Sequence, residues 1–172
     1  MKKILIALLP LILLNACIWK YSPRPGTIPP HIKSVAINET LNNTAEFNLG
    51  QEFTTMLSDR MQRDNLLPLG DPSVAHSVIY TTLNDIRDAV YSYDEAEIVK
   101  EYRLSLRLDF RWYDTVNARD MMQKNISDYE VYYSDQYNSS LSPGDQIKRE
   151  DALGVLMDKL VEKVMVELTS EW

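Results

Sequence analysis

The sequence predicts an α+β fold in two layers, a two-layer sandwich in which two helices cover one face of a mixed sheet of about four strands, in the order β-α-β-β-β-α. Two observations predict the helices: residues 49–61 and 153–168 each carry apolar side chains at three- and four-residue spacing. A third predicts the sheet, because residues 102–112 alternate strictly between apolar and polar side chains. Both helical stripes need an apolar surface to cover, and a two-layer arrangement provides one.

The first predicted elements are a strand at residues 32–38 and, after a polar loop at 39–46, a helix. Asn48 with Gln51 three residues later has the spacing of a capping box, which predicts that the helix begins there. The helix should end near Asn65, since Pro68 and the turn-forming residues 70–72 follow. Its buried stripe is expected to consist of Leu49, Phe53, Met56, Leu57 and Met61.

Three strand-like stretches come next, at residues 77–86, 98–114 and 124–134, with an acidic hairpin tip expected at 91–97. Consecutive strands usually lie side by side, so we expect a three-stranded meander. In the middle strand, one face should be buried beneath both helices, and the other, which carries Arg103, Arg107 and Arg111, should be open. The expected buried residues of that strand are Tyr102, Leu104, Leu106, Leu108, Phe110 and Trp112.

A turn at residues 142–145 is expected to cap the closing helix. The apolar stripe of that helix is expected to comprise Leu153, Leu156, Met157, Leu160, Val161, Val164 and Leu168.

The N-terminus has the pattern of a lipoprotein signal, and it divides the chain into a signal peptide (1–16), a lipidated tether (17–30) and one domain (31–172). Lys2 and Lys3 precede an apolar run at 4–14, and small Ala16 stands before Cys17, the only cysteine. The run is too short to span a membrane, which takes about 20 residues. We expect Cys17 to carry a diacylglycerol, with a plain secretory signal as the alternative.

Composition argues against charge-driven binding to nucleic acids or anionic membranes. The net charge is −7, and removing the two lysines of the signal would make it −9. Proteins bind both kinds of partner mainly through Lys and Arg, which are in the minority here. Membrane attachment should therefore come from acyl chains. We expect no cofactor other than this covalent lipid.

Neither histidine has a ligand partner nearby in the sequence, so His31 and His76 do not predict a metal site. The sequence also lacks a nucleophile elbow, a phosphate-binding glycine loop and a dinucleotide fingerprint. We therefore expect no catalytic residues and no enzyme.

The row Arg103, Arg107 and Arg111 is the candidate binding site, and it has two interpretations. Four-residue spacing on a strand places neighbouring side chains on one face, about 13 Å apart. The row could meet phosphates or sugar acids of a lipid headgroup, which suit planar guanidinium groups. Alternatively, it forms ordinary cross-strand pairs with Asp128, Glu130 or Asp109.

Several short motifs together resemble the LptE family of lipopolysaccharide (LPS)-assembly lipoproteins. They are the lipobox, WxY at 19–21, IPPxIKSVxI at 28–37, QEFT at 51–54, NLxPL at 65–69, RLxL at 103–106 and a final SxW. The resemblance implies a periplasm-facing lipoprotein of the outer membrane that partners the β-barrel LptD. Such a protein plugs the barrel, helps it assemble and contacts LPS.

Two other functions stay open at this point. A periplasmic lipid carrier without a barrel partner would need an apolar cavity large enough for a lipid. A structural envelope lipoprotein would need neither a cavity nor a barrel.

Overall fold

The computed structural model describes residues 28–169, and its elements follow the expected order with two additions. Two short strands, β1 (Val35–Ile37) and β2 (Leu41–Asn42), precede helix α2 (Leu49–Asp64). The long strands are β3 (Ser77–Tyr93), β4 (Val99–Asp114) and β5 (Arg119–Tyr133). A short helix α3 (Asp135–Asn138) then leads to α4 (Arg149–Thr169).

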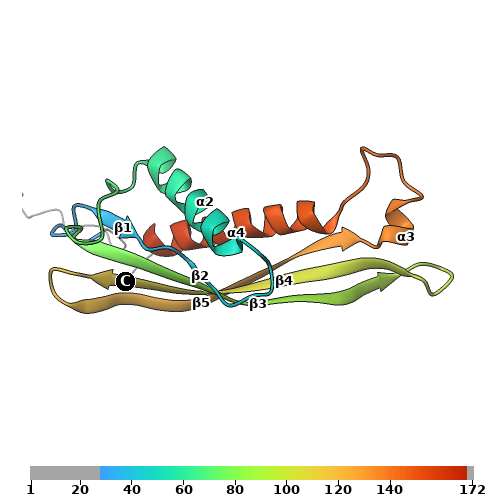
Figure 1. Cartoon of the computed structure of the whole chain (residues 1–172), viewed down its shortest axis with the longest axis horizontal. Helices are drawn as coiled ribbons and strands as arrows, with labels where there is room; N and C mark the ends of the chain where they lie inside the picture. The colour runs from blue at the N-terminus through green and yellow to red at the C-terminus, as the bar shows by residue number, and fades with distance from the viewer. Residues whose placement is uncertain (1–27, 170–172) are drawn as a thin grey trace, which may run out of the picture.

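The strands form one mixed sheet in the order β1-β3-β4-β5, with β2 continuing the line of β1 along β3. β1 and β2 run parallel to β3, whereas β3, β4 and β5 are an antiparallel meander. Both α2 and α4 lie on the same face of the sheet, and the β3–β4 hairpin continues past the first turn of α4 (Figure 1). The predicted α+β two-layer class is confirmed.

The core lies between the sheet and the two helices. In β4 the predicted alternation is confirmed, because Leu104, Leu106, Leu108, Phe110 and Trp112 are all buried, although Tyr102 is only half-buried. The stripe of α2 is buried apart from the half-buried Met56, and that of α4 apart from Leu153.

The start of α2 differs from the predicted capping box. Asn48 has φ 60° and makes no side-chain cap hydrogen bond. A side-chain cap normally requires an extended N-cap residue, and Asn48 is not extended. This turn also lies very close to the chain before it. A Cβ on Gly50 would lie 2.4 Å from the carbonyl oxygen of Thr40, so only glycine fits there. The amide of Thr40 in turn donates to the Thr54 hydroxyl at 2.9 Å.

Several element boundaries were predicted wrongly, and among them β5 begins at Arg119 rather than at residue 124 because its pairing with β4 continues to Asp114. β3 runs to Tyr93 rather than to residue 86, because cross-strand pairing with β4 continues across several register shifts. The hairpin tip is therefore residues 94–98. The predicted polar loop contains β2, and the first strand covers only residues 35–37.

The predicted turn at residues 142–145 is present, with the amide of Asp145 donating to the carbonyl of Ser142 at 2.9 Å. It does not cap the helix, which begins at Arg149. There the Asp151 carboxylate accepts from the Lys148 amide at 3.1 Å.

Candidate functional site

The open face of the sheet carries the predicted arginine row. Arg103, Arg107 and Arg111 are all exposed on β4, on the face away from the helices. The side chain of Arg107 is 55% exposed and that of Arg111 is 44% exposed. The sheet therefore presents the three guanidinium groups to solvent, as the alternation of this strand predicts.

The three arginines do not have equivalent surroundings. Arg111 is held by Asp120 at 2.6 Å and lies over the ring of Tyr113 at 5.1 Å. Arg103 lies over the ring of Tyr129 at 5.5 Å. No carboxylate among residues 28–169 lies within ion-pair distance of Arg103, so its charge is the least compensated of the row.

A fourth arginine, Arg87 on β3, joins the row from the side. It lies opposite Ser105 in the register, between the levels of Arg103 and Arg107. Its side chain is 73% exposed, and its guanidinium contacts Asp85 at 2.9 Å, while Arg107 approaches the same carboxylate at 3.8 Å. Arg87 was not predicted as part of the row, because the predicted strand ended at residue 86. The alternation of Asp85, Arg87 and Ala89 was the signal that could have found it.

These groups surround a shallow hollow of about 660 Å³. Three guanidinium groups, two hydroxyls and one aromatic ring line it together with Asp85. Asp128 and its partner Lys163 also border it, so basic groups outnumber carboxylates, as a site for an anion requires. Its open-face lining includes Asp85, Arg87, Arg103, Ser105, Arg107, Ser127 and Tyr129.

Two of the three predicted cross-strand partners of the row, Asp128 and Glu130, lie on the other face of the sheet. Asp128 is opposite Leu106 and Glu130 is opposite Leu104, and directly opposed residues share a face of the sheet. The two carboxylates therefore point toward α4. The third predicted partner, Asp109, contacts the side-chain amide of Asn125. The interpretation that the arginines pair with these three residues is wrong, and the carboxylates that do pair with them are Asp85 and Asp120.

Two lysines of α4 bind the carboxylates beneath the helix. Lys163 contacts Asp128 at 2.8 Å, and Lys159 contacts Glu130 at 2.5 Å. Burial raises the pKa of Asp128, but hydrogen bonds led by that of Lys163 outweigh it and the pKa falls below its ordinary value. The hydrogen bond from Lys159 likewise lowers the pKa of Glu130.

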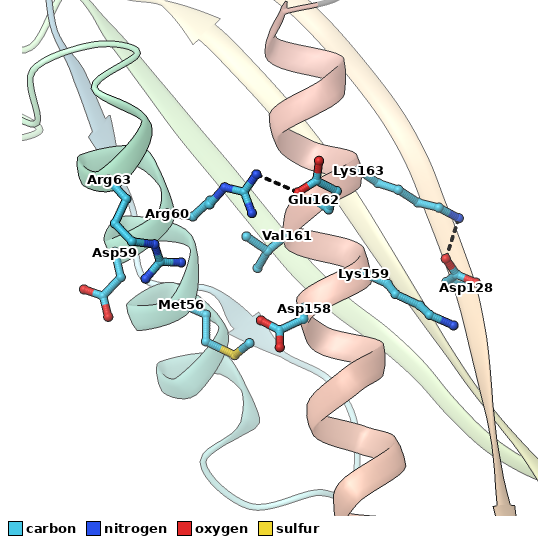
Figure 2. A pocket seen from close by; sticks show the side chains of 10 residues that line it. All are labelled: Met56, Asp59, Arg60, Arg63, Asp128, Asp158, Lys159, Val161, Glu162 and Lys163. Atoms are coloured by element: carbon cyan, nitrogen blue, oxygen red, sulfur yellow. Dashed lines mark ion pairs between the residues drawn. The ribbon is translucent and has the colours of Figure 1, made fainter.

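A charged groove of about 770 Å³ lies between α2 and α4 (Figure 2). Arg60 of α2 reaches Glu162 of α4 at 2.8 Å, and Lys163 reaches across to Asp128 on the strand. Acidic and basic side chains alternate around Met56 and Val161. Four acidic and four basic side chains line the groove, so it has no excess charge of either sign for a ligand, and its ion pairs join the helices to each other and to the sheet.

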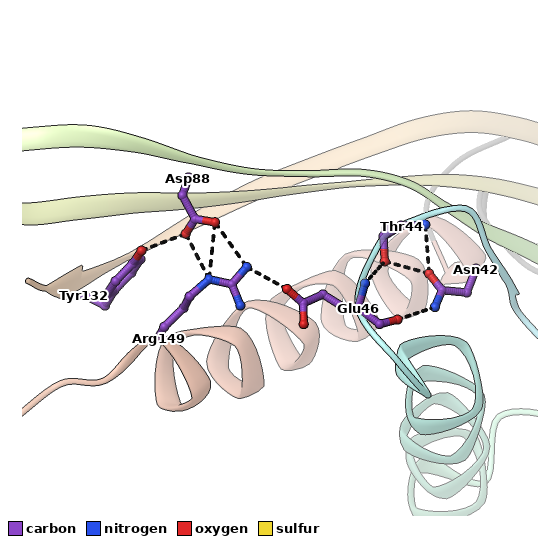
Figure 3. Close-up of polar contacts among 6 residues, drawn as sticks. All are labelled: Asn42, Thr44, Glu46, Asp88, Tyr132 and Arg149. Atoms are coloured by element: carbon purple, nitrogen blue, oxygen red, sulfur yellow. Dashed lines mark hydrogen bonds and ion pairs between the residues drawn. The ribbon is translucent and has the colours of Figure 1, made fainter. Parts of the chain in front are cut away.

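Arg149, the first residue of α4, ties together three distant segments (Figure 3). It donates to Asp88 of β3 at 3.1 Å and to Glu46 of the loop before α2 at 2.8 Å. The hydrogen bond to Asp88 raises the pKa of Arg149 above its ordinary value. Tyr132 of β5 donates to the same carboxylate at 2.8 Å, and burial with this bond raises the tyrosine pKa. The cluster has a structural role in holding the loop onto the sheet.

The fold gives both histidines partners that sequence spacing did not reveal. His31 Nε2 lies 2.8 Å from Oδ2 of Asp114, a carboxylate 83 positions away. His76 Nδ1 lies 2.9 Å from the Ser34 hydroxyl. Burial raises the pKa of Asp114, but hydrogen bonds from His31 and Asn117 outweigh this and lower it to about 2. Within residues 28–169, no three metal-ligating side chains gather in one place.

Among curated protein sequences, no match to this chain is found. A family model described as LptE, lipopolysaccharide-assembly, matches residues 32–168. The chain belongs to the LptE family. The resemblance read from short motifs is thereby confirmed, and the matched region covers the sheet and both main helices.

Solved structures share this LptE-family fold at low sequence identity. A hypothetical protein from Chlamydia trachomatis aligns with a TM-score of 0.56 and 14% identity, covering 79% of this chain and 95% of that one. Rare lipoprotein B from Shewanella oneidensis aligns with a TM-score of 0.53 and 14% identity, covering 78% of this chain and 92% of that one. A minor lipoprotein from Acinetobacter baumannii aligns with a TM-score of 0.54 and 11% identity, covering 80% of this chain and 93% of that one. These likenesses establish the fold.

The predicted lipidation site, Cys17, precedes the part of the chain that the structure describes, as do Trp19 and Tyr21. None of the helices in residues 28–169 is long and apolar enough to cross a membrane.

Proposed function

We propose that this LptE-family protein is a lipid-anchored lipoprotein of the outer membrane, facing the periplasm, that partners and plugs an LptD-like β-barrel in LPS transport and assembly. The family match over residues 32–168 is the observation that carries the proposal. The interior is also consistent with it, because large side chains such as Trp112, Phe53 and Phe110 fill the space between the layers. A filled core favours a protein that acts through its surface over one that carries a lipid inside.

The open face would be the surface that contacts LPS. The phosphates of such a headgroup match the planar guanidinium group, which donates two parallel hydrogen bonds. Arg103 and Arg107 lie about 13 Å apart along β4, with Arg87 between their levels on β3. We propose that Arg103 and Arg107 are the main contacts of the row. Arg111 should contribute less because Asp120 already binds it.

Covalent lipid on Cys17 would hold the domain at the membrane. The net charge of −7 gives no general attraction to an anionic lipid surface. Replacing Cys17 with Ala should therefore move the protein from the membrane fraction to the soluble periplasmic fraction. A Cys17→Ala protein that stays with the membrane in a strain lacking the barrel would contradict the proposed anchor.

Co-purification tests the barrel partnership. The protein, extracted in mild detergent through a tag at its C-terminus, should bring down the LptD-like barrel of the same organism. Depletion should leave that barrel misassembled and reduce LPS at the cell surface. Normal surface LPS after clean deletion, together with no barrel in the purified material, would refute the proposed function.

The substitution Arg107→Glu tests the open face. It reverses an exposed charge without touching the core, so binding of LPS or of the barrel should weaken while the thermal midpoint stays unchanged. The matched control is Arg63→Glu, the same reversal on the exposed surface of α2, which should leave binding intact. If both variants bind LPS and the barrel equally well, the arginine row is an ordinary solvated surface with no role in binding.

A further inference from the structure

The two free edges of the sheet differ in how their backbone groups are satisfied. β5 forms one edge, and its outward carbonyls are covered by lysines from α4. Lys163 donates to the carbonyl of Ser127 at 2.8 Å, and Lys159 donates to that of Tyr129 at 3.3 Å. Lysines placed over a sheet edge are one of the ways in which proteins prevent pairing with another strand.

The outward amides of the same stretch are also satisfied. The Asp128 carboxylate accepts from the amide of Tyr129 at 2.8 Å, and the Glu130 carboxylate accepts from the amide of Val131 at 3.2 Å. Residues 127–131 therefore have few backbone groups left to offer a partner. This edge is closed.

The opposite edge belongs to β3, and only its first half is covered. β1 pairs with residues 77–79 and β2 with residues 82–83, and the last bond is from the amide of Asn43 to the carbonyl of Leu83 at 2.8 Å. Between the register shifts after Leu83 and after Val90, β3 has β4 on one side and, among residues 28–169, no backbone or side-chain hydrogen bond to its outer backbone groups. We call residues 84–90 the open β3 edge.

The side chains of the open β3 edge do not protect it. It contains no proline and no lysine. Its two carboxylates already have partners, since Asp85 binds Arg87 and Asp88 binds Arg149. Exposed apolar side chains lie along it and just beyond it, with Val90 44%, Tyr91 54% and Tyr93 61% exposed. An exposed edge of this kind is a template for an added strand.

Charge argues against a second copy of this chain as the added strand. The hairpin at residues 84–101 carries six acidic side chains and two basic ones. If two identical edges paired in antiparallel fashion about residue 87, the two Arg87 side chains would lie directly opposite each other, and like charges in that position are destabilising. A complementary strand would instead be net basic.

We propose that the open β3 edge pairs, main chain to main chain, with an extended, net-basic segment of the barrel partner. This inference rests on the proposed function, because the segment is assigned to the LptD-like barrel. The added strand would extend the sheet on the side away from α4. Recognition would then be shared between two surfaces, with backbone bonds at this edge and the arginines on the adjoining open face.

Site-specific photo-crosslinking tests the proposal with a matched pair of positions. Ala89 on β3 and Val131 on β5 both lie directly opposite Arg103, one on each side of β4. Benzoylphenylalanine placed at position 89 of the full-length protein should crosslink to the barrel, and the same probe at position 131 should not. A crosslink at 131 alone, or at both positions equally, would overturn the proposal. A crosslink from position 89 to a second copy of this chain would also overturn it, because the edge would then pair in self-association and not with the barrel.

A pair of lysine substitutions gives a second readout. Ala89→Lys places on the open edge the kind of residue that protects β5, and it should lower the amount of co-purified barrel by about tenfold or more, the equivalent of about 1.4 kcal/mol. Val131→Lys should leave the amount unchanged.

Two failures are distinguishable. If the wild-type protein retains the barrel and Ala89→Lys retains it equally, the edge proposal fails and the proposed function stands. If the wild-type protein retains no barrel, both fail.

Discussion

The two faces of β4 differ in how their charged side chains are paired. One face lies under the helices, and the other is open to solvent. Under the helices, the carboxylates of Asp128 and Glu130 are each bound by a lysine of α4, at 2.8 and 2.5 Å. On the open face the pairing is uneven: Arg111 contacts Asp120 at 2.6 Å, but Arg107 approaches its nearest carboxylate only at 3.8 Å, and Arg103 lies over an aromatic ring with no carboxylate of residues 28–169 within ion-pair distance. Charges in a partly buried place need partners, whereas charges in solvent do not, so the open face can keep guanidinium groups available for a ligand.

The largest test of this comparison is a charge placed on each face in turn. Leu106→Asp would bury an unpaired carboxylate between sheet and helices and should cost roughly 3–5 kcal/mol, enough to unfold the domain. The neighbouring Ser105→Asp, on the open face beside Arg87, should change stability by less than about 0.5 kcal/mol. Urea denaturation measures both. Cooperative unfolding of Leu106→Asp at the wild-type midpoint would mean that the faces are assigned the wrong way round.

Acid titration gives the next largest effect, because Asp114 is fully buried at the end of the helix-covered face. Its pKa of about 2 lies below the ordinary 3.8, so the folded state favours the charged carboxylate. The charged carboxylate therefore adds to the free energy of unfolding above about pH 4. This added stability should be lost as the pH falls through the window from 3.8 to about 2.

Asp114→Asn should remove that part of the pH dependence from a series of thermal midpoints measured between pH 5 and 2. His31→Gln should narrow the window, because the hydrogen bond from His31 helps to lower the pKa of Asp114. If the acid unfolding of Asp114→Asn matches that of the wild type, this carboxylate does not control the window.

The smallest expected effect compares one ion pair from each face. A double-mutant cycle on Lys163 and Asp128 should give a coupling energy of up to about 1 kcal/mol, since both side chains are partly screened from solvent. The same cycle on Arg107 and Asp85, which lie 3.8 Å apart, should give close to zero. A stronger coupling on the open face would indicate that Arg107 is a structural residue and is not available to a ligand.

Local pattern was sufficient to predict the helices and the central strand. Four of the five residues in the predicted stripe of α2 are buried, because a helix repeats its side chains every 3.6 residues whatever it packs against. The alternation of β4 predicted which face is buried for the same kind of reason. The capping box failed because Asn48 has a left-handed conformation, whereas an N-cap residue whose side chain bonds the first turn is normally extended.

Both faces of β5 mix polar and apolar side chains, so its sequence could not show on which face Asp128 and Glu130 lie. Register decides this, since the pairing of Leu106 with Asp128 places that carboxylate under α4. The contact between His31 and Asp114 was equally out of reach because 83 positions separate them. Arg87 was missed because β3 continues beyond its clear alternation, held by pairing with β4.

By itself the sequence determined the helical stripes, the buried face of β4, the exposure of Arg103, Arg107 and Arg111, and the motifs by which the family could be recognised. These depend on side-chain periodicity and on local order along the chain. The tertiary structure alone decided the partners of the charges and which sheet edge stays open. Both depend on register and on the path of α4 over β5, which bring together residues that are far apart in the sequence.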